Sequence, residues 1–269
     1  MHGSVSEANT MADKLPKVAA VMLADGRREM VLRARQSFRS QTYENKVLEI
    51  WDTGNPHLQL SELWTSEIHT WAHNVPPRSV GRLRNEANES VEADIICHFD
   101  SDDISHPNRI AEQVALLEAS GADCVGYNEC LFWRTIINAR ETKPWTPQSG
   151  YSEAVIEHDG EAWMYTNKDR RMAIGSSFCY WRRAWEMHPF PDLHRGEDRA
   201  WRANVNCVGF RAFGECERHE PSKEHEPMMI CSIHGGNTCS YDYERVLQAS
   251  PNWKRVPQWD DHCRMVMSL

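Results

Sequence analysis

The sequence lacks several features that would assign it to a functional class directly. No two of its 9 cysteines have the C-x-x-C spacing, which argues against a zinc ribbon or a dithiol redox motif. No apolar run is long enough to cross a bilayer, and the polar residues 1–14 contain no apolar signal-peptide core. A formal charge of −9 argues against sequence-independent binding to nucleic acid. We therefore expect a cytoplasmic protein without a membrane span, whose cysteines stay reduced.

The chain of 269 residues is long enough for one large α/β domain or two small ones. It contains no internal repeat and no linker rich in proline, glycine or serine that would divide it. We expect a flexible leader over residues 1–16 and a single domain over 17–240, with halves at 17–122 and 123–240. Residues 241–269 are expected to form a C-terminal extension.

The first half alternates between predicted strands and predicted helices. Short apolar runs without a helical period predict buried strands at 17–24, 47–51 and 95–99. Helices are predicted over 27–41, 79–91 and 107–119, whereas 56–77 has no regular pattern. This alternation predicts a parallel sheet with right-handed crossovers. The first helix is expected to direct its arginines to solvent, at Arg27, Arg28, Arg33, Arg35 and Arg39.

An acid follows each of the three predicted strands, at Asp25, Asp52 and Asp100. Ligands of open α/β sheets bind outside the carboxyl ends of the strands, so these acids mark a candidate site. The half has no G-x-G-x-x-G and no Walker lysine loop. If the ligand carries phosphates, a metal and arginines must neutralise them.

The most informative stretch is Phe99-Asp100-Ser101-Asp102-Asp103. Asp100 and Asp102 are two residues apart, so their side chains fall on the same side of an extended chain. Two carboxylates so close repel each other unless a cation lies between them. Hard oxygen ligands suit Mg²⁺ or Mn²⁺ shared with substrate phosphates. The alternative is that the acids cap the helix that His106-Pro107 opens.

The second half changes pattern, because short strands follow one another with few helices between them. Strands are predicted at 124–127, 131–137, 162–165, 177–181 and 228–233. One helix is predicted over 182–187, and another begins at Gly196-Glu197-Asp198. The last strand ends in His234-Gly235-Gly236.

Together these motifs resemble glycosyltransferase family 2, over most of residues 17–237. The resemblance rests on the order of seven segments: 37–43, 50–55, 81–85, 99–103, 175–177, 181–183 and 196–201. It implies an α/β fold of the GT-A type, with a Rossmann-like, mostly parallel central sheet and a mixed acceptor-side half. The first strand departs from the family, because it ends in Ala24-Asp25-Gly26-Arg27 where a Thr/Ser-Tyr-Asn turn is usual.

The resemblance implies an inverting transferase that takes a sugar from a nucleotide-sugar donor, with UDP favoured. Asp52 would accept a hydrogen bond from a uracil edge, and Arg84 would meet the base or the diphosphate. The alternatives are a turn-forming Asp52 and an Arg84 on a helix surface. The full donor-binding set is Ala24, Asp25, Asp52, Arg84, Asn85, Asp100, Ser101, Gly175 and Ser176.

The resemblance also implies a catalytic base and a metal. Asp198 would remove the acceptor proton, with Glu197 as its competitor. The alternative is that both acids only begin a helix. Mn²⁺ or Mg²⁺ would be held by Asp100, Asp102 and His234, since a neutral imidazole is compatible with these ions. A lone histidine is otherwise more often structural.

The sequence is also compatible with two rival functions. One is a sugar-nucleotide nucleotidyltransferase of the same fold, although Asp25-Gly26-Arg27-Arg28 is a poor match to its glycine-rich loop. The other is a non-catalytic sugar-binding module. The acceptor stays open among a glycan, a protein, a small molecule and a modified nucleic-acid base, because a fold does not fix the specificity of its site.

Overall fold

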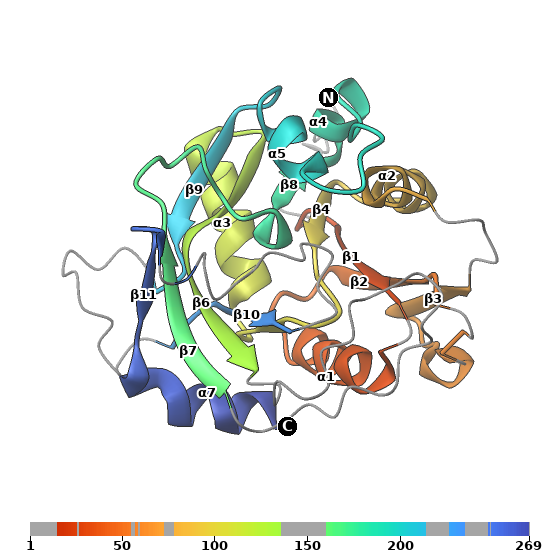
Figure 1. Ribbon diagram of the computed structural model, residues 1–269. Helices are drawn as coiled ribbons and strands as arrows, with labels where there is room; N and C mark the ends of the chain where they lie inside the picture. The colour runs from red at the N-terminus through yellow and green to blue at the C-terminus, as the bar shows by residue number, and fades with distance from the viewer. Residues whose placement is uncertain are drawn as a thin grey trace, which may run out of the picture.

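A computed structural model describes residues 15–25, 27–54, 57–58, 60–72, 78–135, 160–213, 226–234, 247 and 249–268. The described strands form one mixed sheet, in the order β11-β7-β6-β8-β4-β1-β2-β3, and β10, β9 and β5 also join it. Helices cover both faces of this sheet (Figure 1). No helix in these ranges is long and apolar enough to span a membrane.

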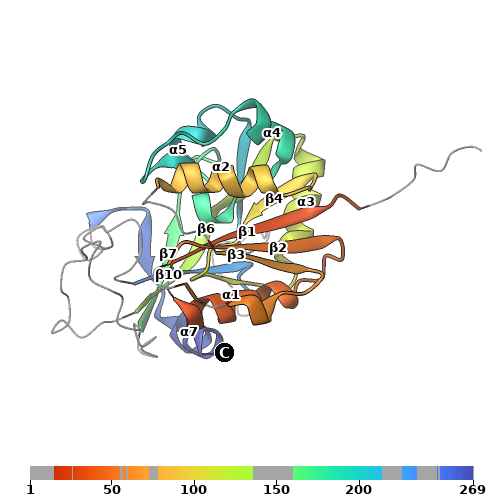
Figure 2. The ribbon, with the colours of Figure 1, turned by 90° about the vertical axis from the view of Figure 1, so that its right-hand side faces the viewer.

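Four parallel strands form the first half of the sheet. They are β1 (Val18–Ala24), β2 (Lys46–Asp52), β3 (Ile68–Ala72) and β4 (Ile95–His98). The connecting helices α1 (Arg28–Arg39) and α2 (Val80–Ser90) lie on opposite faces, as Figure 2 shows. The predicted alternation is therefore confirmed. Strand β3, which follows the 3₁₀ helix η1 (Leu60–Leu63), was not predicted because that segment has no apolar run.

The second half is mixed, as predicted. Its strands are β6 (Cys124–Thr135), β7 (Gly160–Thr166), β8 (Cys179–Trp181), β9 (Cys207–Arg211) and β10 (Met229–Ile233). From outside this half, β5 (Ile104–Ser105) pairs with β10, and β11 (Trp253–Arg255) pairs with β7. Strand β6 is parallel to β9 and β10 but antiparallel to β7 and β8. It is one strand where two were expected, and its register against β9 shifts between Tyr127 and Glu129. The remaining helices are α3 (Arg109–Ser120), η2 (Gly175–Ser177), α4 (Arg182–Met187), α5 (Glu197–Arg202), η3 (Pro257–Trp259) and α7 (Asp260–Met267).

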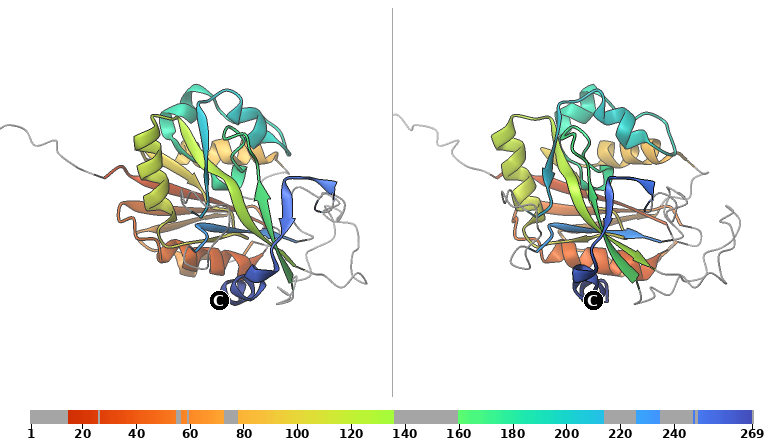
Figure 3. Two further views of the ribbon diagram at one scale, coloured as in Figure 1. Left: turned by 90° about the vertical axis from the view of Figure 1, so that its left-hand side faces the viewer. Right: turned by 60° about the vertical axis from the view of Figure 1, so that its left-hand side comes forward.

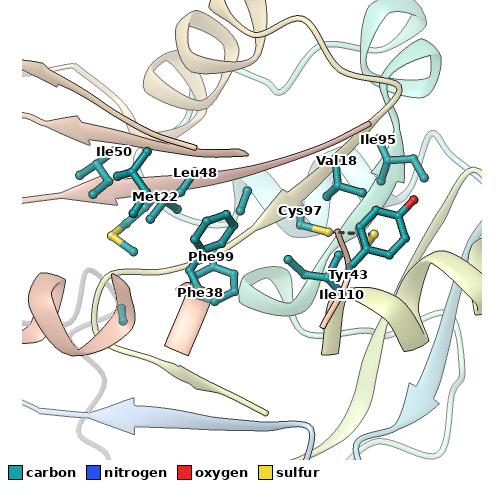
Figure 4. Close-up of a cluster of buried hydrophobic side chains, with 14 of the residues drawn as sticks. Val18, Met22, Phe38, Tyr43, Leu48, Ile50, Ile95, Cys97, Phe99 and Ile110 are labelled. Atoms are coloured by element: carbon teal, nitrogen blue, oxygen red, sulfur yellow. Dashed lines mark hydrogen bonds between the residues drawn. The ribbon is translucent and has the colours of Figure 1, made fainter. Parts of the chain in front are cut away.

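The core lies on both faces of the parallel strands. Val18 and Met22 of β1 face α1 and α3, whereas Val21 faces α2. A strand that is buried on both faces explains the continuous apolar run in the sequence. On the α1 side, the rings of Phe38 and Phe99 meet edge to face at 5.9 Å (Figure 4). Phe99 is the first residue of the acidic stretch, residues 99–103, so this contact anchors the start of that stretch in the core.

The C-terminal segment belongs to the same sheet and core. Strand β11 pairs with β7, and α7 lies beside α1 at the lower edge of the molecule (Figure 3). Arg33 is only 7% exposed, and its Nη1 donates to the carbonyl oxygen of Met267 at 2.7 Å. The expectation that this arginine faces solvent is wrong, because α7 covers the face of α1 that carries it.

Candidate active site

The predicted site residues gather at the carboxyl ends of β1, β2, β4 and β10. Ala24 and Asp52 are register partners at the ends of β1 and β2, and Asp100 follows β4 by two residues. His234 follows β10 directly. Helices α2 and α5 and the 3₁₀ helix η2 contribute Arg84, Glu197, Asp198, Gly175 and Ser176.

Asp102 and His234 meet although they are far apart in sequence. The Asp102 Oδ2 and His234 Nε2 atoms are 2.9 Å apart. The Ser232 N–H donates to Asp103 Oδ1 at 2.9 Å, and the Ser232 hydroxyl donates to the Asp102 carbonyl. These bonds hold the end of β10 against the acidic stretch and so place His234 beside Asp102.

Arg27 lies at the same point. Its Nη1 is 3.3 Å from Asp102 Oδ2 and 3.1 Å from His234 Nε2. Burial alone would raise the pKa of Asp102, but Arg27 and His234 outweigh burial and hold that pKa well below its usual range. The expectation that Arg27 faces solvent is wrong, since its side chain is 18% exposed and pairs with an acid 12% exposed.

We tested whether these residues suit a divalent metal. A carboxylate oxygen and an imidazole nitrogen that converge within 2.9 Å are a compatible ligand pair. In the described ranges no group of three or more His, Cys, Asp or Glu side chains could hold a metal ion. The predicted third ligand, Asp100, is instead paired with Arg84. Among the described residues, Asp102 and His234 thus offer two ligands, which suits an ion that takes its remaining oxygens from water and from substrate phosphates.

Arg84 lies between two carboxylates, one from each half of the chain. Its Nη2 is 3.6 Å from Asp100 Oδ1, and its Nε is 3.5 Å from Glu197 Oε1. Burial raises the pKa values of Asp100 and Glu197, and Arg84 opposes the rise in both. Burial also disfavours the charged guanidinium, but Asp100 and Glu197 leave the pKa of Arg84 raised. Arg84 is therefore a buried cation, and the surface-arginine alternative is excluded by its 6% exposure.

A close approach between the chain at Gly81 and the loop before α5 makes this pairing possible. A Cβ atom at Gly81 would collide with the carbonyl of Pro191 and would lie 3.2 Å from Glu197 Cβ. The Gly81 N–H donates to the Leu193 carbonyl at 3.1 Å. The missing side chain thus lets α5 approach α2 closely enough for Glu197 to reach Arg84.

Asp198 packs against Gly175. A Cβ atom at Gly175 would lie 2.7 Å from Asp198 Cβ and would also collide with the Asp198 carboxylate. Gly196, with φ 75°, precedes α5 in the left-handed conformation that glycine adopts without strain. The half-buried Asp198 carboxylate is hydrogen-bonded by the Arg199 N–H at 2.6 Å. The structure thus brings the predicted base, Asp198, directly onto the predicted donor-site glycine.

Two buried residues that were not predicted support this arrangement. His98 donates from Nδ1 to the Gly175 carbonyl at 2.7 Å, because a carbonyl can only accept. Arg109 is 1% exposed and donates from Nη2 to the carbonyls of His98 and Ser176 at 2.9 and 3.1 Å. Burial and the nearby Arg84 lower the pKa of His98, so its imidazole is neutral. The sequence gives no signal for either residue, because His98 lies in a predicted strand and Arg109 in a predicted helix. Only their burial in the structure shows that they support Gly175 and Ser176.

The other predicted residues are engaged in structural contacts. The Asp52 carboxylate accepts from the N–H groups of Gly54 at 3.0 Å and Leu58 at 2.6 Å. The Asn85 side chain donates to the Phe190 carbonyl and accepts from Trp185 Nε1 and Phe190 N–H. The structure therefore gives Asp52 the turn-forming contacts of the alternative interpretation and ties Asn85 to the loop after α4.

Three further residues lie at the same sheet edge with less distinctive contacts. The Ala24 carbonyl accepts from the Thr53 N–H at 2.9 Å, which joins the ends of β1 and β2. Asp25 is half-buried after β1. Ser101 is 1% exposed, and its buried Oγ has no hydrogen-bond partner among the described residues. The residues predicted to bind the donor thus share one edge of the sheet.

Comparisons with known proteins identify the fold that carries this site. No protein-family model matches the sequence, and a search of curated proteins gave no match. The structure resembles S. aureus TarS 1-349 in complex with UDP-GlcNAc, with a TM-score of 0.54 and 14% identity over 84% of this chain and 61% of that chain. It also resembles TarS 1-349 in complex with UDP, with a TM-score of 0.51 and 13% identity over 81% of this chain and 60% of that chain.

A further structure of S. aureus TarS gives a TM-score of 0.51 and 14% identity, and covers 81% of this chain but 37% of that chain. The chain therefore spans less than two thirds of the length of each of these structures. At this identity the similarity establishes the fold. The chain has the mixed α/β fold of GT-A-type glycosyltransferases, built on a mostly parallel central sheet.

Proposed function

We propose that this protein is an inverting glycosyltransferase that moves a sugar from a UDP-sugar to an acceptor hydroxyl. The observation that carries the proposal is the chain of contacts from Asp100 through Arg84 to Glu197, beside an Asp198 that packs on Gly175. It joins the carboxyl end of β4 to the start of α5, at the edge where α/β folds bind ligands.

The donor assignment is supported by the fold comparison. TarS, which shares the fold, has been crystallised with UDP-GlcNAc and with UDP. In this chain, Arg27 pairs with Asp102 and Arg84 with Asp100, and guanidinium groups suit phosphate oxygens. No glycine-rich phosphate loop competes for this role in the sequence.

We assign the base to Asp198. Inversion needs one carboxylate that removes the acceptor proton as the sugar carbon is attacked. Glu197 is 7% exposed and pairs with Arg84, whereas Asp198 is half-buried beside Gly175. Glu197 then serves to hold Arg84, and the acceptor side of the site is left to Asp198.

We also propose that the site uses Mn²⁺ or Mg²⁺. Asp102 and His234 would hold the ion, and Asp100 would stay with Arg84 or approach the ion through water. When bound, such an ion stabilises the negative charge that grows on the departing diphosphate. The guanidinium groups of Arg84 and Arg27 would add positive charge near the same diphosphate.

A nucleotide-sugar panel tests the proposal. The purified chain is heated with UDP-sugars, GDP-sugars and ADP-sugars, with and without Mn²⁺, and the midpoint of unfolding is compared. Protection by a UDP-sugar, followed by UDP release when an acceptor hydroxyl is added, is the expected result. Protection by nucleoside triphosphate and sugar phosphate with pyrophosphate release would indicate the rival nucleotidyltransferase. Protection without any turnover over a broad acceptor panel would indicate a binding module.

A further inference from the structure

The cluster of Arg27, Asp102 and His234 contains a feature that the proposed function does not explain. Arg27 Nη1 lies 3.3 Å from Asp102 Oδ2 and 3.1 Å from His234 Nε2, the two atoms that the proposed metal would contact. The three side chains come from the end of β1, the acidic stretch after β4 and the end of β10. Their meeting point is thus fixed by three parts of the sheet edge.

Arg27 and a divalent ion cannot use these two atoms in the same way at once. A divalent ion lies about 2.0–2.2 Å from its oxygen and nitrogen ligands. The Asp102 carboxylate can only accept, so His234 Nε2 faces it as a donor at 2.9 Å, and a metal at these two atoms would take the place of both this hydrogen bond and the contact with Arg27. Two positive charges at the same carboxylate oxygen would also repel each other.

The arginine is also poorly satisfied where it lies. Its Nε is buried and has no hydrogen-bond partner among the described residues. A buried donor without a partner carries a desolvation cost, which favours an arrangement in which the side chain moves. The side chain is 18% exposed, so part of it already meets solvent.

We propose that Arg27 is a built-in counter-ion of the Asp102–His234 pair, which competes with the divalent metal and gives up its place when the metal binds. This inference rests on the proposed function, because it takes the same metal site. It predicts that the chain binds metal alone more weakly than its two ligands would allow.

Binding of Mn²⁺ without nucleotide tests the competition directly. Free Mn²⁺ is followed by its electron paramagnetic resonance signal while it is titrated into the full chain and into Arg27→Gln. Hydrogen bonds to charged groups are strong enough to change a binding constant by about tenfold. Arg27→Gln should therefore bind Mn²⁺ about tenfold more tightly than the unmodified chain.

Two further variants decide whether the gain arises at this site. Arg39→Gln removes one exposed positive charge from the same helix and should leave Mn²⁺ affinity unchanged. Adding Asp102→Asn to Arg27→Gln should remove the gain. Should Arg27→Gln fold poorly, Arg27→Met keeps the apolar stem of the side chain and should show the same gain.

An Mn²⁺ affinity that does not rise in Arg27→Gln and Arg27→Met would overturn the inference, and so would a gain that survives Asp102→Asn. The proposed function fails differently, because its failure is the loss of UDP-sugar binding and transfer in the unmodified chain. Protection by the UDP-sugar is measured in the same samples, so the two failures can be distinguished.

Discussion

The guanidinium of Arg84 lies 3.5 Å from the carboxylate of Glu197, and the two side chains are 8% and 9% exposed. Arg84 belongs to α2 in the first half of the chain, and Glu197 begins α5 in the second. A buried charge needs its partner, because an unpaired charge in the interior is costly. The pair therefore links the two halves of the chain, and in the proposed function it leaves the role of base to Asp198.

The first prediction concerns the base. Asp198→Asn keeps the shape of the side chain and removes its basicity. The turnover of transfer should fall by about two to four powers of ten, the usual contribution of a general base. Affinity for the UDP-sugar should change little, because Arg84 and the acidic stretch are unaltered. Turnover and UDP-sugar binding are measured on the same preparation.

Glu197→Gln is the matched variant at the adjacent position. It leaves Arg84 with Asp100 alone, so it should lower the free energy of unfolding by about 1–3 kcal/mol. Turnover per folded molecule should fall much less than in Asp198→Asn. If turnover survives in Asp198→Asn and collapses in Glu197→Gln, the base is Glu197.

The second prediction concerns Gly175. Its hydrogen atom faces the Asp198 side chain, and a methyl group would lie 2.7 Å from Asp198 Cβ. Gly175→Ala should displace Asp198 and reduce turnover by about tenfold or more, since small misplacements of reacting groups are costly. The measurement is turnover at saturating donor.

The combination with Asp198→Asn is the control for that effect. If Gly175→Ala acts through Asp198, it should reduce turnover little further in a chain that already carries Asp198→Asn. A full additional loss would mean that Gly175 acts on the donor instead.

The parallel part of the fold could be predicted because its strands are buried on both faces. β1 reads as an unbroken apolar run, and Asp52 and Asp100 lie where such runs end. The predicted helix end at residue 119 lies one residue from the end of α3, where Gly121, with φ 63°, forms the left-handed C-cap that glycine favours. Strand β3 was missed because it is an edge strand whose last residues, Trp71 and Ala72, are exposed.

The contacts of the arginines could not be predicted from sequence. In the sequence of the predicted helix 27–41, nothing distinguishes Arg27 and Arg33 from the exposed Arg39. In the structure, Arg27 pairs with Asp102, and Arg33 donates to the Met267 carbonyl. Both partners come from segments far along the chain, so no local period reports them. The contacts of Asp52 could not be predicted either. The family resemblance implies a contact with the donor base, whereas the Asp52 carboxylate accepts from the N–H groups of Gly54 and Leu58.

The third prediction concerns the donor base. UDP should raise the midpoint of thermal unfolding more than GDP or ADP at equal concentration. Asp52→Asn should weaken this effect, because an amide offers one acceptor oxygen where the carboxylate offers two. A larger shift with GDP would exclude Asp52 from reading the base and leave it the role of holding Gly54 and Leu58.

The fourth prediction concerns the metal. Asp102→Asn removes the charge that Arg27 and His234 share and should abolish metal-stimulated transfer. The fold should persist, because the Asp102 carbonyl still accepts from Ser232. Transfer by the unmodified chain and by the variant is compared in Mn²⁺ and in EDTA. Full activity of Asp102→Asn in EDTA would exclude the metal role.

The last prediction concerns stability as a function of pH, at a site remote from the acidic stretch. Burial raises the pKa of Glu112 on α3, although the Tyr127 hydroxyl, at 3.2 Å, partly opposes the rise. A carboxyl whose pKa is raised in the folded state stabilises the fold below its unfolded pKa of about 4.3, and this contribution is lost as pH rises through the folded value. Glu112→Gln keeps an acceptor for Tyr127 without the charge, so its stability relative to the unmodified chain should increase from about pH 4 upward and then level off. Urea midpoints between about pH 4 and pH 8 measure this difference, and Glu118→Gln, which removes an exposed carboxylate from the same helix, corrects for net charge. A difference between the Glu112→Gln and Glu118→Gln curves that stays constant with pH would show that burial does not penalise the charged Glu112.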